Sequence, residues 1–155
     1  RKLFVRESKD FLQKYFKKEL FFTDVEGKTK DEVLKNLCRK VEKEKGLPET
    51  FTASVLKREE LTPTDYGNLV ALPHPERAFQ ERAFVAVAVL KEPIFWFRQK
   101  VQVVFLTAIG REEDENLQQF YEATTDLILR PADVQNLIRH PDYDRLIQLL
   151  RRAEE

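Results

Sequence analysis

Two apolar segments in the middle of the chain decide the fold: FVAVAVL, residues 84–90, and VQVVFLTAI, residues 101–109. Both consist almost entirely of β-branched, aromatic and small apolar residues, and the first two of these classes are enriched in β-strands. Apolar runs this continuous are typical of strands that are covered on both faces. We therefore predict two strands of a central sheet with helices packed on either side of it.

The flanking segments predict the remaining elements. One helix begins at Thr29, an N-cap residue with Glu32 three positions later, and ends at Gly46. Its apolar face contains Val33, Leu34, Leu37, Cys38 and Val41. We expect further strands at 20–22 and 69–72, a loop at 61–67, and further helices at 51–59, 115–129, 132–139 and 143–151. The order of the elements predicts an α/β fold, a single-domain sandwich with a central mixed β-sheet flanked by helices.

The N-terminal residues 1–18 have the pattern of a charged amphipathic helix. Its apolar side contains Leu3, Phe4, Phe11, Leu12, Tyr15 and Phe16. We expect a linker helix from an upstream domain here, with the domain itself over 19–155, and the helix could equally contact another domain or form a dimer. The chain begins at Arg1 and contains no methionine, so we expect it to be a piece of a longer protein.

Composition narrows the class of function. The formal net charge is zero, which gives the domain no general attraction for nucleic acid. No run of about 18 apolar residues is present, so we expect no membrane span, and a single cysteine fits the reducing cytoplasm. One cysteine and two histidines also make a poor metal site, so we expect neither a metal nor an organic cofactor.

Two groups of residues could carry chemistry. Arg58 and Glu59 are followed by Thr62 and Thr64, and His74 lies between Pro73 and Pro75 at the expected end of a strand. A neutral imidazole can act as a nucleophile, and a guanidinium offers paired donors that match phosphate oxygens. Such a set suits phosphoryl transfer to nitrogen, although a single histidine near an Arg–Glu pair is more often structural. Three other residues favour structural roles: Cys38 in the core, His140 at a helix end, and Trp96 packed at a strand turn or contacting a partner domain.

The order of these residues is more specific than their types. The segment VLKREELTPTDYGNLVALPHP, residues 55–75, resembles the active-site region of the enzyme IIA domain of the bacterial phosphotransferase system, mannitol–fructose type. The resemblance extends from about residue 20 to residue 150 and includes KTKDEVLKNLCRKV and DYDRLIQLL. The segments ALPHP, FVAVAVLKEPIFW and VQVVFL are most similar to the C-terminal IIA-like domain of BglG-type transcriptional antiterminators and activators.

The resemblance implies a role for each candidate residue. His74 would accept a phosphoryl group and Arg58 would bind it, with Glu59, Thr62 and Thr64 in support. Some carrier enzymes of this type have a second histidine near the start of the helix after the last long strand. In REEDENLQQF the resemblance places Asn116 there, and an amide can donate a hydrogen bond to phosphate but cannot carry positive charge. Carriers also more often have glycine where this chain has Pro75.

The resemblance therefore implies a phosphoryl-accepting regulatory domain of a cytoplasmic, sugar-responsive transcriptional regulator. Its partners would be the histidine-containing phosphocarrier protein, a IIB domain, or both, together with other domains of the parent protein, and a homodimer is possible. Whether this phosphohistidine chemistry serves as enzyme activity or only as regulation stays open. The alternative is a true IIA carrier that passes phosphate from the phosphocarrier protein to a sugar-specific IIB domain. A third possibility is a dimerisation module that has lost its chemistry, against which Arg58 and His74 argue.

Overall fold

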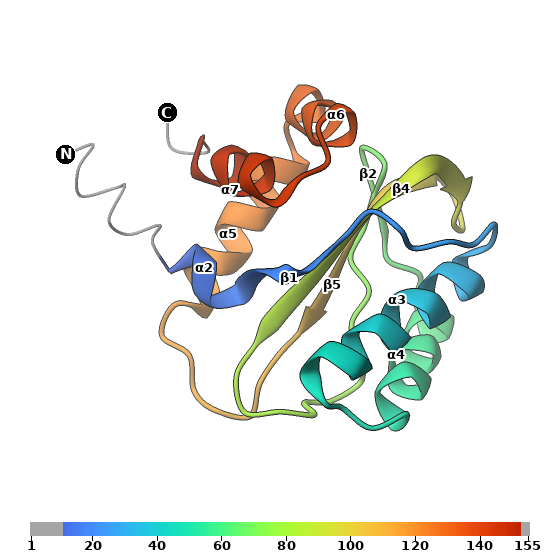
Figure 1. The fold of residues 1–155 in the computed structure, drawn as a ribbon, viewed down its shortest axis with the longest axis vertical. Coiled ribbons are helices and arrows are strands. Elements are labelled where there is room, and N and C mark those ends of the chain that lie inside the picture. The colour runs from blue at the N-terminus through green and yellow to red at the C-terminus, as the bar shows by residue number, and fades with distance from the viewer. Residues whose placement is uncertain (1–10, 153–155) are drawn as a thin grey trace.

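The computed structural model describes residues 11–152 of the 155-residue chain, and a five-stranded sheet in the order β1-β4-β5-β3-β2 lies at its centre (Figure 1). The strands are β1 (Phe16–Phe22), β2 (Asp65–Gly67), β3 (Val70–Ala71), β4 (Phe84–Phe95) and β5 (Lys100–Ala108). The helices are α2 (Leu12–Tyr15), α3 (Lys30–Lys45), α4 (Thr50–Leu61), α5 (Leu117–Ile128), α6 (Pro131–Arg139) and α7 (Tyr143–Arg151).

The two segments that decided the expected fold form the central antiparallel pair of this sheet. Phe84 of β4 lies opposite Ala108 of β5, and Val87 lies opposite Phe105. On the outside, β1 runs parallel to β4, β3 runs parallel to β5, and β2 is antiparallel to β3. The sheet is therefore mixed, and the predicted α/β sandwich is confirmed.

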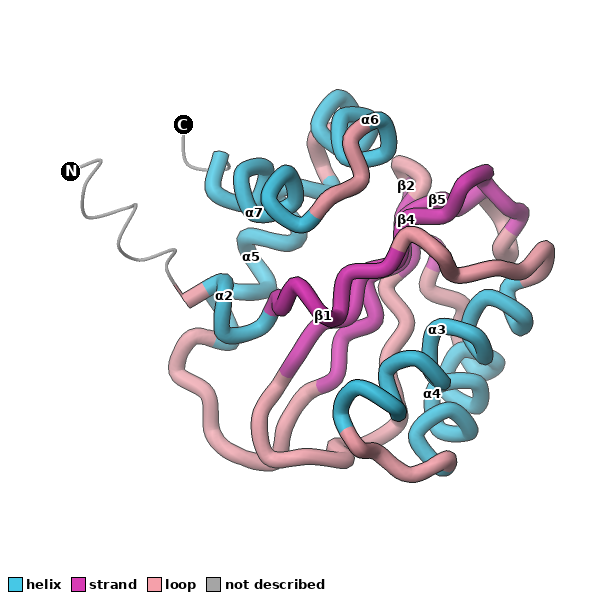
Figure 2. The backbone as a smooth tube through the Cα atoms, in the orientation of Figure 1, coloured by secondary structure: helices cyan, strands magenta, loops and turns pink. Residues whose placement is uncertain are grey.

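Helices cover the two faces of the sheet in two separate layers, with α3 and α4 on one face and α2, α5, α6 and α7 on the other (Figure 2). The alternation of side chains along a strand explains how β4 serves both layers. Val85, Val87 and Val89 pack toward α5 and its neighbours. Ala86 and Ala88 face α3 and α4. The repeated Val-Ala pattern thus supplies one side of each core.

The helix α3 follows its predicted start and stop residues. The Thr29 hydroxyl accepts a hydrogen bond from the Glu32 backbone N–H at 3.2 Å, and Gly46 ends the helix with a left-handed φ of 66°. All five predicted apolar residues of α3 are buried, Cys38 among them. Burial raises the pKa of the Cys38 thiol to about 12, helped by the nearby Glu42 charge and opposed by a hydrogen bond with Thr52. The predicted structural role of this cysteine is confirmed.

The N-terminal helix is shorter than predicted within the described residues. It ends at Tyr15, and the strand β1 begins at Phe16, where we expected the helix to continue to residue 18. Pairing of Phe16 with Val85 and burial of Phe16 outweigh the local helical pattern. The predicted helix over 1–10, including Leu3 and Phe4, lies outside the described residues.

Several further boundaries also differ from expectation. The segment expected as a loop at 61–67 contains the short strand β2, and only Val70 and Ala71 of the expected strand 69–72 form a ladder. In the other direction, β4 continues beyond residue 90 to Phe95. The predicted helix α7 has the expected bounds. The differences in this part of the chain lie in the segments on both sides of His74.

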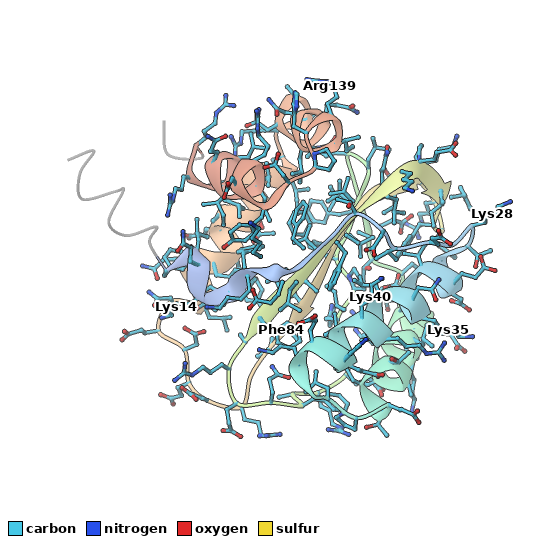
Figure 3. All side chains as sticks on the ribbon, in the orientation of Figure 1. Lys14, Lys28, Lys35, Lys40, Phe84 and Arg139 are labelled. Atoms are coloured by element: carbon cyan, nitrogen blue, oxygen red, sulfur yellow. The ribbon has the colours of Figure 1, made fainter. Side chains whose placement is uncertain are left out.

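Charged side chains cover the outside of both layers. Lys28, Lys35 and Arg139 are exposed and extend away from the ribbon (Figure 3). Within residues 11–152, no helix combines the length and the apolar character that crossing a membrane requires.

Candidate functional site

His74 lies just beyond the end of β3, where the backbone ladder stops. The carbonyl of Pro73 accepts a last hydrogen bond from the Thr107 N–H at 3.0 Å. Neither Pro73 nor Pro75 has an N–H to continue the ladder, and both are buried. The chain therefore leaves the sheet at a fixed point, with the half-buried His74 between two anchored prolines.

The imidazole of His74 is held by its own backbone. Its Nδ1 lies 3.1 Å from the carbonyl oxygen of Leu72. A carbonyl only accepts, so this contact assigns the ring proton to Nδ1 in the neutral form and leaves a lone pair on Nε2. This arrangement can support nucleophilic chemistry at Nε2.

The helix α4 brings Arg58 to the same region. Ser54 and Arg58 are one turn apart and lie on one face of α4. The Ser54 hydroxyl accepts a hydrogen bond of 2.7 Å from the backbone N–H of Glu76, two residues after His74. The half-buried Arg58 donates from Nη1 to the Thr62 carbonyl at 2.9 Å. This second contact holds the guanidinium at the C-terminal end of α4.

Glu59 connects α4 to the strand that leads to His74. Its side chain is 2% exposed. It accepts hydrogen bonds from the Thr64 backbone N–H and the Thr64 hydroxyl, both at 2.7 Å. The Thr64 carbonyl in turn accepts from the N–H of Leu72 at 3.0 Å. A chain of hydrogen bonds therefore runs from Glu59 through Thr64 to Leu72, the residue that holds the His74 ring.

Residues of the turn between β4 and β5 also form hydrogen bonds with this network. Trp96 donates from its indole Nε1 to Glu59 at 2.9 Å. Asp65 accepts from the backbone N–H groups of Arg98 at 2.7 Å and Gln99 at 3.0 Å. Burial acts to raise the pKa of Asp65, but the hydrogen bonds from Arg98, Gln99 and other backbone N–H groups outweigh it and lower the pKa.

Among the described residues, the side chains of Asn116 and Thr62 form no hydrogen bond with this network. Asn116 is the residue before α5, where its side-chain oxygen accepts from Lys14 at 2.7 Å and its Nδ2 donates to Gln119 at 3.0 Å. Within residues 11–152, none of its hydrogen bonds reaches His74. Thr62 is exposed and contributes only its backbone carbonyl to Arg58. The chemical roles of all these predicted site residues stay predictions.

Sequence reasoning missed two members of the network, Ser54 and Asp65, and gave Trp96 only a packing or partner role. Ser54 is a buried polar residue between Phe51 and Val55 on the inner face of α4. The buried face of α4 combines Phe51 and Val55 with the polar residues Thr52, Ser54 and Glu59, and this mixture is the sequence feature that could have indicated it. Asp65 bonds to residues more than 30 positions away, and no local pattern announces such a contact.

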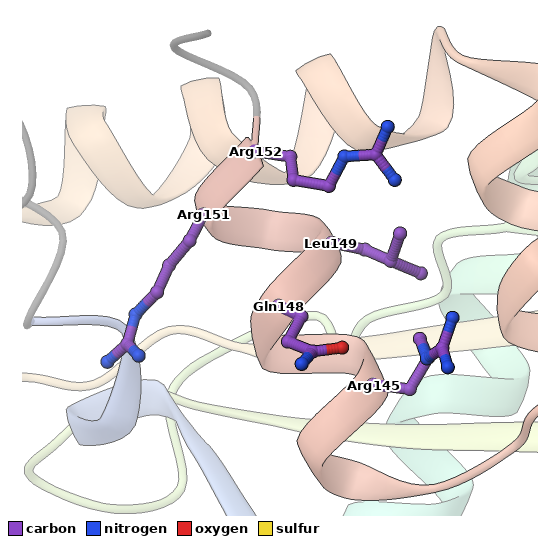
Figure 4. Close-up of a pocket in the computed structure, with 5 residues that line it drawn as sticks. All are labelled: Arg145, Gln148, Leu149, Arg151 and Arg152. Carbon is purple, nitrogen blue, oxygen red and sulfur yellow. The ribbon is translucent and has the colours of Figure 1, made fainter.

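Two cavities lie elsewhere on the described part of the chain. One of about 320 Å³ lies on α7 and is lined by Arg145, Gln148, Leu149, Arg151 and Arg152 (Figure 4). A larger one of about 900 Å³ includes residues of α2 and of the loop before α5, among them Tyr15 and Asp114. His74 lines neither of them. Among residues 11–152, no cluster of three histidine, cysteine, aspartate or glutamate side chains could hold a metal ion.

Comparison with known protein families shows which family the chain belongs to. The sequence model of the family "Phosphoenolpyruvate-dependent sugar phosphotransferase system, EIIA 2" matches residues 14–153. The chain belongs to this EIIA 2 family. The resemblance inferred from residues 55–75 is therefore confirmed at the level of the family.

Relatives and solved structures agree with this assignment. The EIIA 2 domain is 36% identical to the probable licABCH operon regulator of Bacillus subtilis over 90% of its length, and 27% identical to the transcriptional regulator ManR of the same organism over 77%. It spans only 22% and 18% of those two proteins.

Solved structures show the same fold at lower identity. One matched chain comes from the Escherichia coli complex of enzyme IIA mannitol with phosphorylated enzyme IIB. It superimposes with a TM-score of 0.71 at 19% identity, covering 87% of this chain and 97% of the matched chain. The nitrogen regulatory protein IIA-Ntr of Neisseria meningitidis gives a TM-score of 0.74 at 18% identity, covering 90% and 99%.

Proposed function

We propose that this EIIA 2 domain accepts a phosphoryl group on Nε2 of His74 and serves as a regulatory module of a sugar-responsive transcriptional regulator. The observation that carries the proposal is the contact of His74 Nδ1 with the Leu72 carbonyl. It leaves one defined nitrogen free on a half-buried ring, and Ser54, one turn before Arg58 on α4, bonds to the segment that follows this ring. Similarity to two full-length regulators supports the regulatory setting.

The transfer step exchanges one bond to phosphorus for another. A bond forms between Nε2 and phosphorus while the bond between phosphorus and the donor, a phosphohistidine of the phosphocarrier protein or a IIB phosphocysteine, breaks. The electron pair of that bond stays on the donor, which leaves as an imidazole with a proton on its other ring nitrogen or as a thiolate. The proton on Nδ1 stays in place, and the Leu72 carbonyl stabilises the positive charge that develops on the ring. Arg58 supplies paired donors to the phosphoryl oxygens, because phosphoryl transfer depends mainly on positioning and charge neutralisation.

A phosphoryl group on His74 would change the domain's surface. It adds a charge of about −1.5 to −2 at neutral pH, by analogy with other phosphorylated side chains. Such a charge would alter contacts with other domains of the parent protein, or with a second copy of the domain, in the cytoplasm of a bacterial cell. Glu59, Thr64 and the Thr62 carbonyl would act in support of Arg58, whereas the supporting role of Asn116 stays a prediction.

The second candidate function is that of a carrier passing the phosphoryl group onward to a sugar-specific IIB domain. Similarity to Multiphosphoryl transfer protein 1 of Escherichia coli, 24% identical over 136 residues, favours keeping it. Passage of label from the phosphocarrier protein through this domain to a IIB domain separates the two candidates. A regulator would exchange phosphate with its donor only, whereas a carrier would pass the label on at a comparable rate.

The direct test is intact mass and acid-labile phosphate after incubation with enzyme I, the phosphocarrier protein and phosphoenolpyruvate. We expect one added phosphoryl group on the native chain and none on the His74→Ala variant. Uptake by His74→Ala would refute the site. No uptake by the native chain, even from a phosphorylated IIB domain, would leave the dimerisation module as the better description.

A further inference from the structure

The turn between β4 and β5 combines exposed and buried aromatic residues in sequence. Phe95 is 62% exposed and Phe97 is 50% exposed, whereas Trp96 between them is 4% exposed. The Trp96 backbone N–H donates to the Gln99 carbonyl at 2.9 Å and closes the turn. Trp96, the single tryptophan of the chain, therefore extends from the turn back into the domain.

The indole of Trp96 donates to the Glu59 carboxylate, for which the described residues show no ion pair. One oxygen of Glu59, Oε2, accepts from both Trp96 Nε1 and the Thr64 N–H, while Oε1 accepts from the Thr64 hydroxyl. A buried carboxylate is tolerated only when donors of this kind satisfy it. Removing the indole N–H would leave Oε2 with the Thr64 N–H alone and loosen the carboxylate.

The position of Glu59 makes this bond relevant to the site. Glu59 is the neighbour of Arg58 at the end of α4, and it fixes Thr64, whose carbonyl holds the strand segment leading to His74. A second attachment involves Asp65, the residue after Thr64. Asp65 accepts hydrogen bonds from two backbone N–H groups of the same turn. The turn is therefore bonded to Glu59 in α4 and to Asp65 in β2, on either side of residues 60–64.

We propose that Trp96 is a positioning residue for phosphoryl transfer, acting through Glu59 to hold Arg58 and the 62–64 loop in the arrangement that receives the phosphoryl group. This inference rests on the proposed function of His74. It assigns the turn a role in the chemistry, whereas a core-filling role would require only the volume of the indole. It also links the exposed Phe95 and Phe97 to the site, because anything that moves the turn moves Glu59.

The test compares Trp96→Phe with Tyr143→Phe in the full chain. Trp96→Phe retains an aromatic ring and removes the N–H that Glu59 accepts. Tyr143→Phe is the matched control, since it removes one hydroxyl that donates to the Phe16 carbonyl in the opposite layer. Rates of phosphoryl uptake are measured against the concentration of phosphorylated phosphocarrier protein, which separates kcat from KM.

We expect Trp96→Phe to lower kcat about tenfold, with KM within about twofold of the native value, because the partner does not touch the buried indole. Tyr143→Phe should leave both constants unchanged. Equal rates for the two variants would overturn the inference while leaving the proposed function intact. If the native chain takes up no phosphoryl group, both the inference and the proposed function fail.

A second measurement needs no substitution at the turn. The single indole N–H gives one resolved NMR signal, and we expect that signal to shift when the native chain is phosphorylated. In the same mixture the His74→Ala chain should show no shift. An unchanged indole signal in fully phosphorylated native protein would overturn the inference even if Trp96→Phe failed to fold.

Discussion

The two helical layers differ in how their buried polar groups are used. In the layer of α3 and α4, Ser54 and Glu59 bond to the segments beside His74. In the layer of α5, α6 and α7, Thr124 donates to the Phe120 carbonyl of its own helix, and Asp133 pairs with Arg130 and Arg152. Neither of these polar groups reaches the site.

Aromatic contacts occur in both layers: in the α4 layer Phe51 lies 5.5 Å from Phe79 between ring centroids, and in the opposite layer Phe120 packs on two aromatic rings. The Phe120 ring stacks on Tyr15 at 4.7 Å between centroids and lies 5.8 Å from Phe16. Aromatic packing of this kind contributes mainly stability, since apolar burial has little directional preference. Hydrogen bonds have strict geometry, so the α4 layer can orient the site groups. The comparison implies that stability and phosphoryl transfer can be altered separately.

The largest expected effect on stability comes from Phe120 in the layer of α5, α6 and α7. Phe120→Ala should lower the free energy of unfolding by about 3–5 kcal/mol, through lost burial and the cavity that remains. Urea unfolding followed by circular dichroism measures this. Phosphoryl uptake per folded molecule, measured well below the unfolding midpoint, should stay native. A loss of uptake in the folded fraction would show that the two layers are coupled.

The second-largest effect is expected for Arg58, where a substitution should change the rate of phosphoryl transfer strongly and the stability only slightly. Arg58→Ala should slow phosphoryl uptake by about a hundredfold, because the guanidinium donors to the phosphoryl oxygens are lost. The unfolding free energy should change by less than about 1 kcal/mol, since the side chain is only half-buried and bonds to one carbonyl.

Lys57→Ala is the control for Arg58→Ala. It removes one positive charge from the same helix at an exposed neighbouring position. Uptake by Lys57→Ala should remain within about twofold of the native rate, because exposed charges are screened. If Lys57→Ala slowed uptake as much as Arg58→Ala, general charge would explain the effect better than the Arg58 geometry.

The residues compared above also show which features of the fold and the site could be predicted from the sequence. The Thr29 and Gly46 helix ends and the Val-Ala alternation of β4 depend on local rules, and both could be predicted. His74 and Arg58 came from an ordered segment of 21 residues. The bonds of Glu59 to Trp96 and of Ser54 to Glu76 join residues 37 and 22 positions apart, so only the folded chain places them. Phe16 joined the sheet because tertiary pairing outweighed a local helical pattern.

A smaller effect is expected from a single hydroxyl of α4. Ser54→Ala removes the acceptor for the Glu76 N–H and should cost about 1 kcal/mol of stability. It should also slow uptake a few-fold, because the segment after His74 loses its attachment to α4. Thr124→Val removes a buried hydroxyl from the opposite layer and should cost similar stability with no change in uptake. Identical uptake by the two variants would mean that α4 does not orient His74 through Ser54.

The smallest effect concerns the charge of Asp65, which Asp65→Asn removes while keeping an acceptor for Arg98 and Gln99. The pKa of Asp65 is lowered in the folded chain, so its charge stabilises the fold fully above the unfolded pKa of about 3.9. That contribution is lost as the pH falls through the lower folded pKa. Native protein should therefore resist urea better than Asp65→Asn at pH 7, and the gap should close in acid below about pH 4. A gap that stayed constant with pH would show that the acceptor geometry of Asp65, and not its charge, fastens the turn.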